Sequence, residues 1–590
     1  MKKKKKILIT GSINDKSNKK KASTILLAKP YKNFDKKNYY KNTKILCDIY
    51  HWNIKKNLRR DEKYILKVYE IYLKIITSKL NQIHNVKYPV RYWRIIVGPW
   101  LQQLITIVFD RLEIIKSLEK KYKITEVRSE IYRKEDMIFK NTEEFLLFIS
   151  KKEDQFNNFI FSEIIKYRSK KIIKKFSLLN RNIKSKNKNN NLNFNIIIKK
   201  IYTFIFKLFV KSEDVFIIDT YFKKIFNFKL QIILKQFPFF WNKVLFESKK
   251  EINWNIRNLF YKKNNNEFLT ILNHFIYNLI PKSFLEDYLD VVKLTNNLPW
   301  PKNPRAIIAS TAYFTDDVFK VWTAKKNLGG ANLISTQHGG NFFTAKDHYH
   351  EKHMKKISNY ILSWGEHEKK NQSIIPFFNF KTQNIIIQPC KTGNLLIGDY
   401  VYQQYVVSLY NYYKGPQNIL FLDRKIKFLK KLKKKIINKT FKKNKNSYQN
   451  KNFSDNRIVE RSLYASSNIK VNYTSEDFYE ELRKSRIFVA NSNQTTFLEA
   501  LNLNFPTVIY FDTRYEELRD SVIPYYKILK DNKIFFEDSL KAASHINNVW
   551  DNVDVWWQSK KVQSAVNIFC NKFSKRSTNF KFEGFLNKLN

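Results

Sequence analysis

Short apolar runs alternate with helix-compatible segments through the second half of the chain, and this alternation constrains the fold more than any other feature. Three runs, RAIIAS, NLIST and NYILSW, lie within residues 305–364, after the linker LPWPKNP. Five more follow: NIIIQP (384–389), NILFLD (418–423), NIKVNY (468–473), RIFVAN (486–491) and TVIYFD (507–512). Strands that alternate with helices form parallel sheets. The sequence therefore predicts an α/β protein.

The domain organisation follows from length and from a break in this pattern near residue 380. A chain of 590 residues, 43% of them hydrophobic, can bury two or three cores. We expect two facing doubly wound (Rossmann-like) lobes, one over residues 1–380 and one, with closing helices, over residues 381–590. A largely helical insertion is expected at about 120–290. Ligands in such sheets bind outside the carboxyl ends of the strands, so the site is expected there.

The N-terminal half predicts further strands. The apolar residues after the basic start MKKKKK, the segment ILCDIYHWN at 45–53 and the segment RYWRIIVGPWL at 91–101 each predict a short strand, the last ending at the turn signal Gly98-Pro99. Helical spacing of apolar residues predicts a helix from Asp61 to Leu80. Inside the insertion, VFIIDTYF at 215–222 predicts one more strand.

The formal charge of +57 comes from 109 Lys and Arg residues against 52 Asp and Glu residues. Such an excess fits an anionic partner: nucleic acid, lipid headgroups or phosphorylated substrates. Lys, Asn and Ile also fill almost every window, as expected when AT-rich codons occupy tolerant surface positions. The sequence leaves both explanations open.

Cysteine usage and hydropathy favour a cytoplasmic protein. Cys47, Cys390 and Cys570 are far apart and form no CxxC pair, which predicts neither disulfides nor a zinc site. The apolar part of the N-terminus is too short for a signal-peptide core. The apolar stretches at 194–222 and 228–246 are interrupted by Lys before they reach the roughly 18 residues of a membrane span. This basic, aromatic region remains a candidate for peripheral contact with the inner membrane.

A polar turn after the predicted strand at 486–491 gives the strongest local signal for a ligand site. Its candidate donor-binding residues are Ser492, Asn493, Thr495, Thr496 and Glu499. Backbone donors and hydroxyls at a helix N-terminus can hold a diphosphate, and Glu499 can accept from ribose hydroxyls. The alternative is an ordinary helix start, with Ser492 or Thr495 as the cap and Glu499 as its capping-box partner.

His338 follows the run NLIST closely and precedes Gly339 and Gly340. Two glycines let the backbone come close to a ligand, and an imidazole at a strand end can take a proton from an acceptor hydroxyl. We predict that His338 is catalytic and that the two glycines form cleft backbone. The alternative is a structural histidine.

No metal site is expected. The nearby group His348, His350, Glu351 and His353 matches no closed ligand set, so it predicts a surface loop. A DxD metal-diphosphate motif is not evident, and the pair Asp316-Asp317 is explained equally well by a helix cap.

Several segments, in this order, resemble transferases of bacterial O-antigen and related surface-polysaccharide clusters: RYWRIIVGPWL with Asp110-Arg111, STQHGGNFF, ILSWGE, ANSNQTTFLEALNLNFPTVIYFD and NNVWDNVDVWW. The resemblance implies a GT-B-like fold, distantly similar to CDP-glycerol glycerophosphotransferases and capsule Kdo transferases. It also implies that His338 and Gly339 occupy the position of a catalytic base and that the turn at 492–499 is a donor-binding loop. Where that pattern has a compact arginine-bearing strand and loop, this chain is lysine-rich, and only Arg424, Arg457 and Arg461 are candidates for a contact to donor phosphate.

The hypothesis that follows is metal-independent transfer of a sugar or polyol phosphate from a nucleotide-activated donor to a glycan or lipid-linked glycan acceptor. The donor is a substrate, and no cofactor and no nucleic acid are expected. Two alternatives remain: a non-catalytic basic protein that binds nucleic acid, and an inactive GT-B scaffold that binds no donor.

Overall fold

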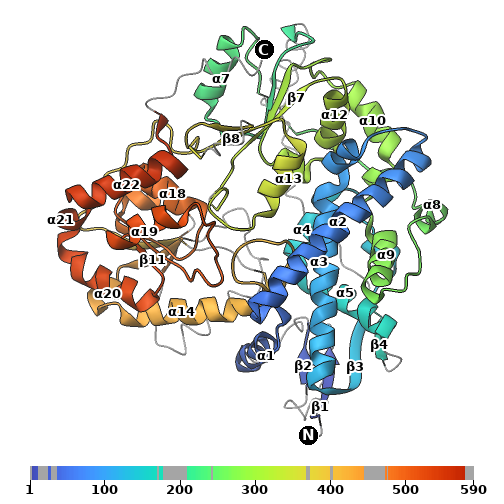
Figure 1. Cartoon of the computed structure of the whole chain (residues 1–590), viewed down its shortest axis with the longest axis horizontal. Helices are drawn as coiled ribbons and strands as arrows, with labels where there is room; N and C mark the ends of the chain where they lie inside the picture. Colours follow the sequence, from blue (N-terminus) through green and yellow to red (C-terminus); the bar gives the residue numbers. More distant parts are fainter. Residues whose placement is uncertain are drawn as a thin grey trace, which may run out of the picture.

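The strands of the computed structural model pair in parallel and form three sheets (Figure 1). The structure describes residues 3–10, 24–27, 36–168, 172–176, 209–240, 243–339, 341–366, 373–398, 403–443, 472–474 and 476–577. The chain is thus a mixed α/β protein with parallel sheets, as the alternation of apolar runs predicts.

The first sheet lies at the N-terminal end of the molecule (Figure 1) and has the order β2-β1-β3-β4. Its strands are β1 (Lys5–Ile9), β2 (Thr24–Leu26), β3 (Lys123–Ile131) and β4 (Ile172–Phe176). The strand predicted after the basic start is confirmed. Two other strands of this sheet, β3 and β4, come from the range in which a largely helical insertion is expected.

The second sheet has five strands in chain order, β5-β6-β7-β8-β9. They are β5 (Phe216–Ile218), β6 (Ala306–Ala309), β7 (Asn332–Thr336), β8 (Tyr360–Ser363) and β9 (Ile374–Pro376). The runs VFIIDTYF, RAIIAS, NLIST and NYILSW are therefore strands, as predicted. The strands expected in one N-terminal lobe divide between this sheet and the first.

The third sheet has six strands in the order β12-β11-β10-β13-β14-β15. They are β10 (Asn394–Gly398), β11 (Thr440–Lys443), β12 (Asn472–Thr474), β13 (Ser485–Ala490), β14 (Thr507–Tyr510) and β15 (Phe535–Phe536). Counted from β10, this is the order 3-2-1-4-5-6 of a Rossmann sheet. The runs RIFVAN and TVIYFD are confirmed as strands, and NIKVNY lies mostly outside the described residues.

Helices cover the sheets and fill the space beside them. The helices before β6 are α1 (Lys36–Asp48), α2 (Lys55–His84), α3 (Val90–Lys121), α4 (Thr142–Lys151), α5 (Glu153–Arg168), α7 (Lys224–Ile233), α8 (Trp254–Asn258), α9 (Glu267–Leu279) and α10 (Tyr288–Asn296). The later helices are α11 (Ala312–Thr315), α12 (Asp317–Leu328), α13 (Tyr349–Ile357), α14 (Asn418–Lys431), α15 (Lys434–Ile437), α17 (Phe478–Arg483), α18 (Thr495–Asn502), α19 (Ile523–Asp531), α20 (Ser539–Val549), α21 (Val553–Trp557) and α22 (Lys560–Phe573). The predicted helix at 61–80 is part of α2.

Four predicted strands are wrong. Residues 45–53 belong to α1 and to a 3-10 turn at His51–Asn53, and residues 91–101 lie in α3. NILFLD begins α14, and NIIIQP forms no strand. Three of these runs lie in helices and NIIIQP lies in a loop with Ile386 exposed, because a short apolar run does not by itself distinguish a strand from a helical or loop segment.

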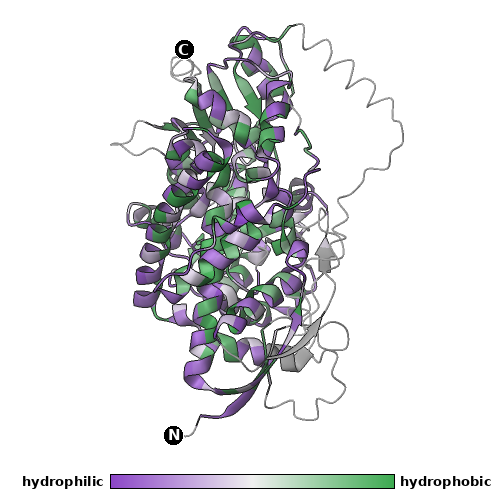
Figure 2. Cartoon of the chain, turned by 90° about the vertical axis from the view of Figure 1, so that its right-hand side faces the viewer, coloured by the Kyte–Doolittle hydropathy of each residue, from purple (hydrophilic) through white to green (hydrophobic). Residues whose placement is uncertain are grey.

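Helix α3 contributes its buried apolar residues to the largest apolar cluster of the described residues, and Figure 2 shows hydrophobic segments gathered in the interior of the molecule. The helix continues through Pro99, whose carbonyl accepts a hydrogen bond of 2.7 Å from the Tyr349 hydroxyl. Among the described residues α3 is the one helix long and apolar enough to cross a membrane by composition, and its most apolar window is wholly buried. It is therefore a core helix, which the sequence prediction missed.

The second and third sheets share one apolar core. Ile308 and Ile334 of the five-stranded sheet belong to the same buried cluster as Leu396 and Phe488 of the six-stranded sheet. This shared core fixes the two sheets against each other, so the loops at their edges have defined positions.

Candidate functional site

The loops that leave the carboxyl ends of β7 and β13 carry the predicted site residues, and the structure brings these loops together. A Cβ atom added to Gly339 would lie 2.9 Å from Thr495 Oγ1. Such a separation is shorter than a carbon–oxygen van der Waals contact, so this approach requires glycine. The base candidate and the donor-binding candidate therefore lie at one junction between two sheet edges. Gly340 lies outside the described residues.

This junction coincides with the point where the order of the six-stranded sheet reverses. The reversal falls between β10 and β13, which are neighbours in space but are separated by β11 and β12 in the chain. Gly398 ends β10, and a Cβ atom there would lie 3.3 Å from Thr496 Oγ1 and closer still to the Phe488 ring. Ligands of doubly wound sheets bind at such a reversal.

His338 lies among aromatic rings at this junction. Its ring centre is 4.7 Å from that of Phe342, 5.3 Å from that of His350 and 6.3 Å from that of Tyr221. Burial, and then the nearby His348 and Lys381, lower the pKa of His338 to about 3. The imidazole is therefore neutral at pH 7. Its Nδ1 is buried and has no hydrogen-bond partner among the residues that the structure describes.

A charged group that the sequence analysis missed lies beside His338. The Lys381 ammonium is 3.3 Å from Glu499 Oε1 and 4.5 Å from the centre of the Tyr221 ring. Glu499 also accepts a hydrogen bond of 3.2 Å from the Tyr479 hydroxyl. Tyr221 closely follows the confirmed strand β5, and this position could have marked it as a candidate site residue from the sequence. Lys381 gives no such signal in a chain with 109 Lys and Arg residues.

The start of α18 differs from an ordinary capped helix. Gln494 occupies the N-cap position, and no side chain makes a cap hydrogen bond there. The alternative in which Ser492 or Thr495 caps the helix with Glu499 as its box partner is therefore wrong. The contacts of Glu499 are with Lys381 and Tyr479, because its buried carboxylate needs a charged or hydrogen-bonding partner.

Asn493 links the two edges by hydrogen bonds. Its backbone N–H donates to Glu516 Oε2 at 2.7 Å, and its side-chain amide donates to Thr344 Oγ1 at 3.1 Å. The Tyr526 hydroxyl donates to Asn493 Oδ1 at 2.8 Å. Burial raises the pKa of Glu516 to about 8. The Asn493 side chain, like that of Glu499, is thus occupied by internal hydrogen bonds, and the Ser492 side chain is buried beside it.

The histidine group expected in a surface loop is buried instead, and that prediction is wrong. His348 is the N-cap of α13 and accepts at Nδ1 from Glu351 N–H at 3.2 Å. The side chains of His348 and His353 are 4% and 2% exposed. No group of three or more His, Cys, Asp or Glu side chains in the described part of the chain is placed to hold a metal ion.

The remaining candidates have structural partners or lie outside the described residues. Asp316 caps α12 by accepting from Phe319 N–H at 3.0 Å, as the helix-cap explanation predicts. Arg424 pairs with Asp512 at 2.9 Å. Arg457 and Arg461 lie outside the described residues.

Comparison with known protein families agrees with a transferase. The family model described as LIC12162 family transferase matches residues 6–588. Among curated proteins, none matches the chain. A match over nearly the whole length shows the family, and the chain belongs to the LIC12162 family of transferases.

Proposed function

We propose that this transferase moves a sugar or a polyol phosphate from a nucleotide-activated donor to a glycan or lipid-linked glycan acceptor, in the assembly of a bacterial surface polysaccharide such as O-antigen. The proposal treats the second and third sheets as the facing lobes of a GT-B-like enzyme. The observation that carries it is the close approach of Gly339 to Thr495 at the reversal of the six-stranded sheet.

The donor is proposed to bind on the side of the six-stranded sheet. There the N-terminus of α18 and the side chains of Ser492, Thr495 and Thr496 provide hydrogen-bond donors for a diphosphate. Gly398 lets the Phe488 ring and the Thr496 hydroxyl pack closely against the end of β10. Lys381 supplies the positive charge for which an arginine was expected, and Glu499 accepts from the ribose hydroxyls.

The acceptor is proposed to react beside His338. The imidazole takes the proton of the acceptor hydroxyl as that oxygen bonds to the transferred group, and the nucleotide phosphate leaves with the electron pair of the broken bond. With its pKa lowered to about 3, His338 holds no proton before the donor arrives. The anionic donor raises that pKa, since a nearby opposite charge favours the imidazolium. Donor binding thus makes His338 a stronger base for the acceptor hydroxyl.

A thermal-shift panel tests the donor site with CMP, CDP, UDP, GDP and TMP. We expect one nucleotide to stabilise the wild-type protein and the effect to be lost in Glu499→Ala, because bound ligand adds RT ln(1 + [L]/Kd) to the free energy of unfolding. Glu480→Ala is the matched control, since Glu480 is 57% exposed and pairs with Arg483 on the surface. A protein that no nucleotide shifts, but that single-stranded nucleic acid shifts in a salt-sensitive way, would be a nucleic-acid-binding protein instead.

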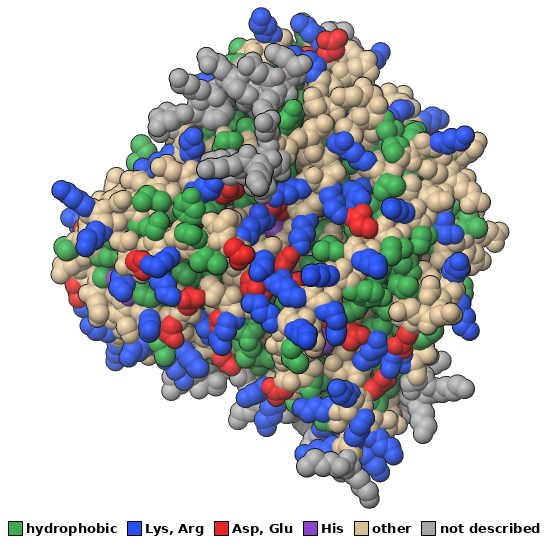
Figure 3. Space-filling view, in the orientation of Figure 1, with side chains coloured by type: hydrophobic (Ala, Val, Ile, Leu, Met, Phe, Trp, Pro, Cys, Tyr) green, Lys and Arg blue, Asp and Glu red, His purple; other side chains and the backbone are tan. Residues whose placement is uncertain are grey.

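The surface favours the transferase over that alternative. In Figure 3, Lys and Arg side chains are spread over the visible face and mixed with acidic and hydrophobic ones. Proteins that bind nucleic acid without catalysis gather their cations in a stripe or patch. The distribution here supports a compositional origin for much of the charge.

Helix α7 is proposed to mediate peripheral contact with the cytoplasmic face of the inner membrane. It exposes Ile225, Phe228 and Ile232 at 67%, 45% and 54%, beside the exposed Lys224 and Lys229. Apolar side chains flanked by lysines bind anionic bilayers. Flotation with phosphatidylglycerol vesicles should recover the protein, and Ile225→Asp/Phe228→Asp should abolish this. Val555→Asp, at a residue 77% exposed on α21, should not. Equal recovery of all three proteins would refute the assignment.

A further inference from the structure

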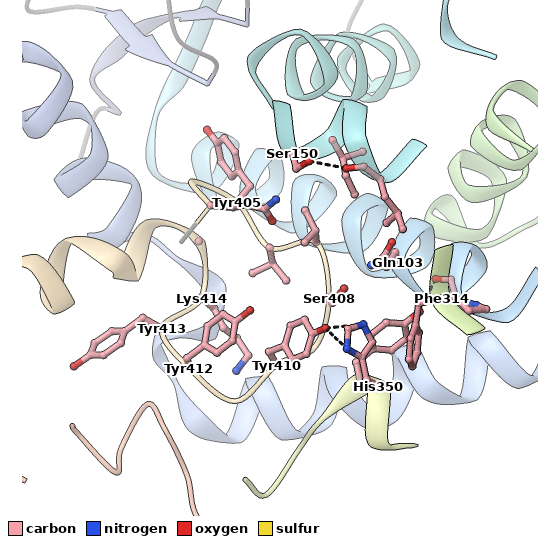
Figure 4. Close-up of a pocket in the computed structure, with 18 of the residues that line it drawn as sticks. Gln103, Ser150, Phe314, His350, Tyr405, Ser408, Tyr410, Tyr412, Tyr413 and Lys414 are labelled. Atoms are coloured by element: carbon pink, nitrogen blue, oxygen red, sulfur yellow. Dashed lines mark hydrogen bonds between the residues drawn. The ribbon is translucent and has the colours of Figure 1, made fainter. Parts of the chain in front are cut away.

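A cavity of about 410 Å³ adjoins the candidate site, but none of the predicted catalytic, donor-binding or cleft residues lines it. It lies between α3, α4, α11, the start of α13 and the loop 403–418 (Figure 4). We call it the tyrosine cavity, after the tyrosines among its lining residues, which include Gln103, Phe314, His350, Ser408 and Tyr410. Its volume falls in the range of roughly 300–1,000 Å³ that small-molecule sites occupy.

Three polar atoms of lining residues lack hydrogen-bond partners among the described residues: Gln103 Oε1, Ser408 Oγ and the hydroxyl of Tyr413, whose ring Figure 4 shows directed away from the other labelled side chains. Gln103 Oε1 and Ser408 Oγ are buried, and the two residues are only 8% and 6% exposed. Buried polar groups are nearly always paired, so each such atom calls for a ligand or a bound water. A group that both donates and accepts hydrogen bonds, such as a hydroxyl, satisfies both Gln103 Oε1 and Ser408 Oγ.

The wall opposite α3 is held rigidly. The backbone N–H of Gln404 donates to Glu153 Oε1 at 2.8 Å, and the guanidinium of Arg111 donates to the carbonyl of Val406. Asp110 and Asn157 in turn hold Arg111, at 2.9 Å each. The Asp110-Arg111 pair that contributes to the family resemblance is therefore a buried anchor for the loop that forms the cavity.

The lining is aromatic and carries little net charge. Phe314, Tyr349 and Tyr410 present ring surface, and the Tyr410 hydroxyl hydrogen-bonds the His350 ring at about 3 Å. No acidic residue lines the cavity, and its cation, Lys414, interacts electrostatically with Glu62. Aromatic faces with hydroxyl and amide groups suit a neutral, hydroxylated ring, whereas a diphosphate requires cations.

The cavity is next to His338. The Phe314 ring lies 4.0 Å from the His350 ring and 6.2 Å from the His338 ring, centre to centre. The same aromatic group therefore forms the cavity wall and contacts the base candidate. We propose that the tyrosine cavity binds a neutral sugar ring of the acceptor and so directs an acceptor hydroxyl toward His338. This inference rests on the proposed transferase mechanism.

Saturation-transfer difference NMR on the full-length protein tests it, with methyl glucoside, methyl galactoside and methyl N-acetylglucosaminide as neutral probes and methyl glucuronide as the charged one. We expect at least one neutral glycoside to bind and to bind more tightly than the glucuronide, because burying a carboxylate among aromatic rings costs more free energy than burying a neutral ring. Gln103→Met and Ser408→Ala should each weaken that binding at least tenfold and leave the nucleotide thermal shift unchanged.

Tyr413→Phe is the matched control. Tyr413 also lines the cavity, but Figure 4 shows its ring directed away from the other labelled side chains, where it stacks on Tyr515 with centres 4.4 Å apart. Loss of its hydroxyl should leave sugar binding intact. If neutral glycosides fail to bind while a nucleotide does, or bind equally to wild type and both variants, the inference is wrong and the proposed function stands. If no nucleotide binds, the proposed function itself fails.

Discussion

The two sheet edges that meet at the site differ in chemistry. The edge of the five-stranded sheet presents His338 among buried aromatic and histidine rings, where burial suppresses the charge of each imidazole. The edge of the six-stranded sheet presents Gly398, the hydroxyls of Thr495 and Thr496 and a helix start without a side-chain cap. One edge is suited to moving a proton and the other to holding an anion. In the proposed mechanism, proton transfer and donor binding are therefore divided between the two sheets.

Removing the proton-transfer group should have the largest effect. We expect His338→Ala to lower turnover by about 10²- to 10⁴-fold, the usual contribution of a general base, and to leave nucleotide binding intact because the donor contacts lie on the other edge. Turnover is measured as release of the nucleotide that the thermal-shift panel identifies. His545→Ala is the control, since burial also lowers the pKa of His545, to about 4, but it packs against Trp556 away from the site. Unchanged turnover would remove His338 from the mechanism.

The contact between the edges can be broken and then partly restored. Gly339→Ala places a methyl group 2.9 Å from Thr495 Oγ1, and overpacking of this kind costs about 1–3 kcal/mol in the free energy of unfolding. Thr495→Ala removes the obstructing atom, so the double variant should recover most of that stability in urea unfolding but not nucleotide binding.

Gly329→Ala is the control for this cycle, because its nearest neighbour, the Lys326 carbonyl, is 3.4 Å away. If the two substitutions are additive, with no coupling energy, the edges are not in contact in solution.

The pH dependence of stability compares buried titratable groups on the two edges. Burial lowers the pKa of His353 to about 3, below its value near 6.5 in the unfolded chain, so below pH 6.5 the unfolded state binds a proton that the folded state does not. Stability should therefore fall with falling pH, by up to about 1.4 kcal/mol per pH unit for this residue. For Glu516, on the other edge, the contribution to stability changes with pH in the opposite direction. Its pKa is raised to about 8, so it stabilises the protein below pH 4.5 and loses that contribution as pH rises to 8.

Urea unfolding between pH 5 and 8 separates these contributions. His353→Gln should flatten the acid side of the stability profile, and Glu516→Gln should flatten the neutral to alkaline side. A wild-type profile that is level from pH 5 to 6.5, or one that neither variant changes, would contradict the assigned burial of these groups.

The fold could be predicted from the sequence where the strands are short, β-branched and followed by turn signals. The runs at 306–309, 332–336 and 485–490 satisfy these conditions and are strands. Prediction failed at 91–101 because α3 is apolar on all sides, and a helix buried on every face has no 3.6-residue periodicity to reveal it. The number of sheets could not be predicted from the sequence either, because it depends on which strands pair, and the paired residues are far apart in the chain.

Candidate site residues could be named from the sequence where polar side chains follow a strand directly. His338 and Thr495 were named in this way, and the structure brings their loops together, while their roles stay predictions. Lys381 and the tyrosine cavity were not named, because a lysine is uninformative in this composition and Gln103, Ser408 and Tyr410 come from elements that meet only in the folded chain. Burial of His348 and His353 was missed since histidine next to lysine is typical of a surface loop.

The buried position of α3 also matters for how the protein is made. Three of the helices that cover α3 are α9, α12 and α13, and the last of them ends at Ile357, about 240 residues after α3 itself ends. At a synthesis rate of about 5–20 residues per second, roughly 12–50 s pass between the synthesis of α3, a helix apolar enough to enter a bilayer, and that of the last of these three partners, while α2, which precedes α3 in the chain, is already made. During that interval chaperones and the membrane-insertion machinery compete for the same segment. The helix that organises the finished core is thus the segment most exposed to mistargeting in the nascent chain.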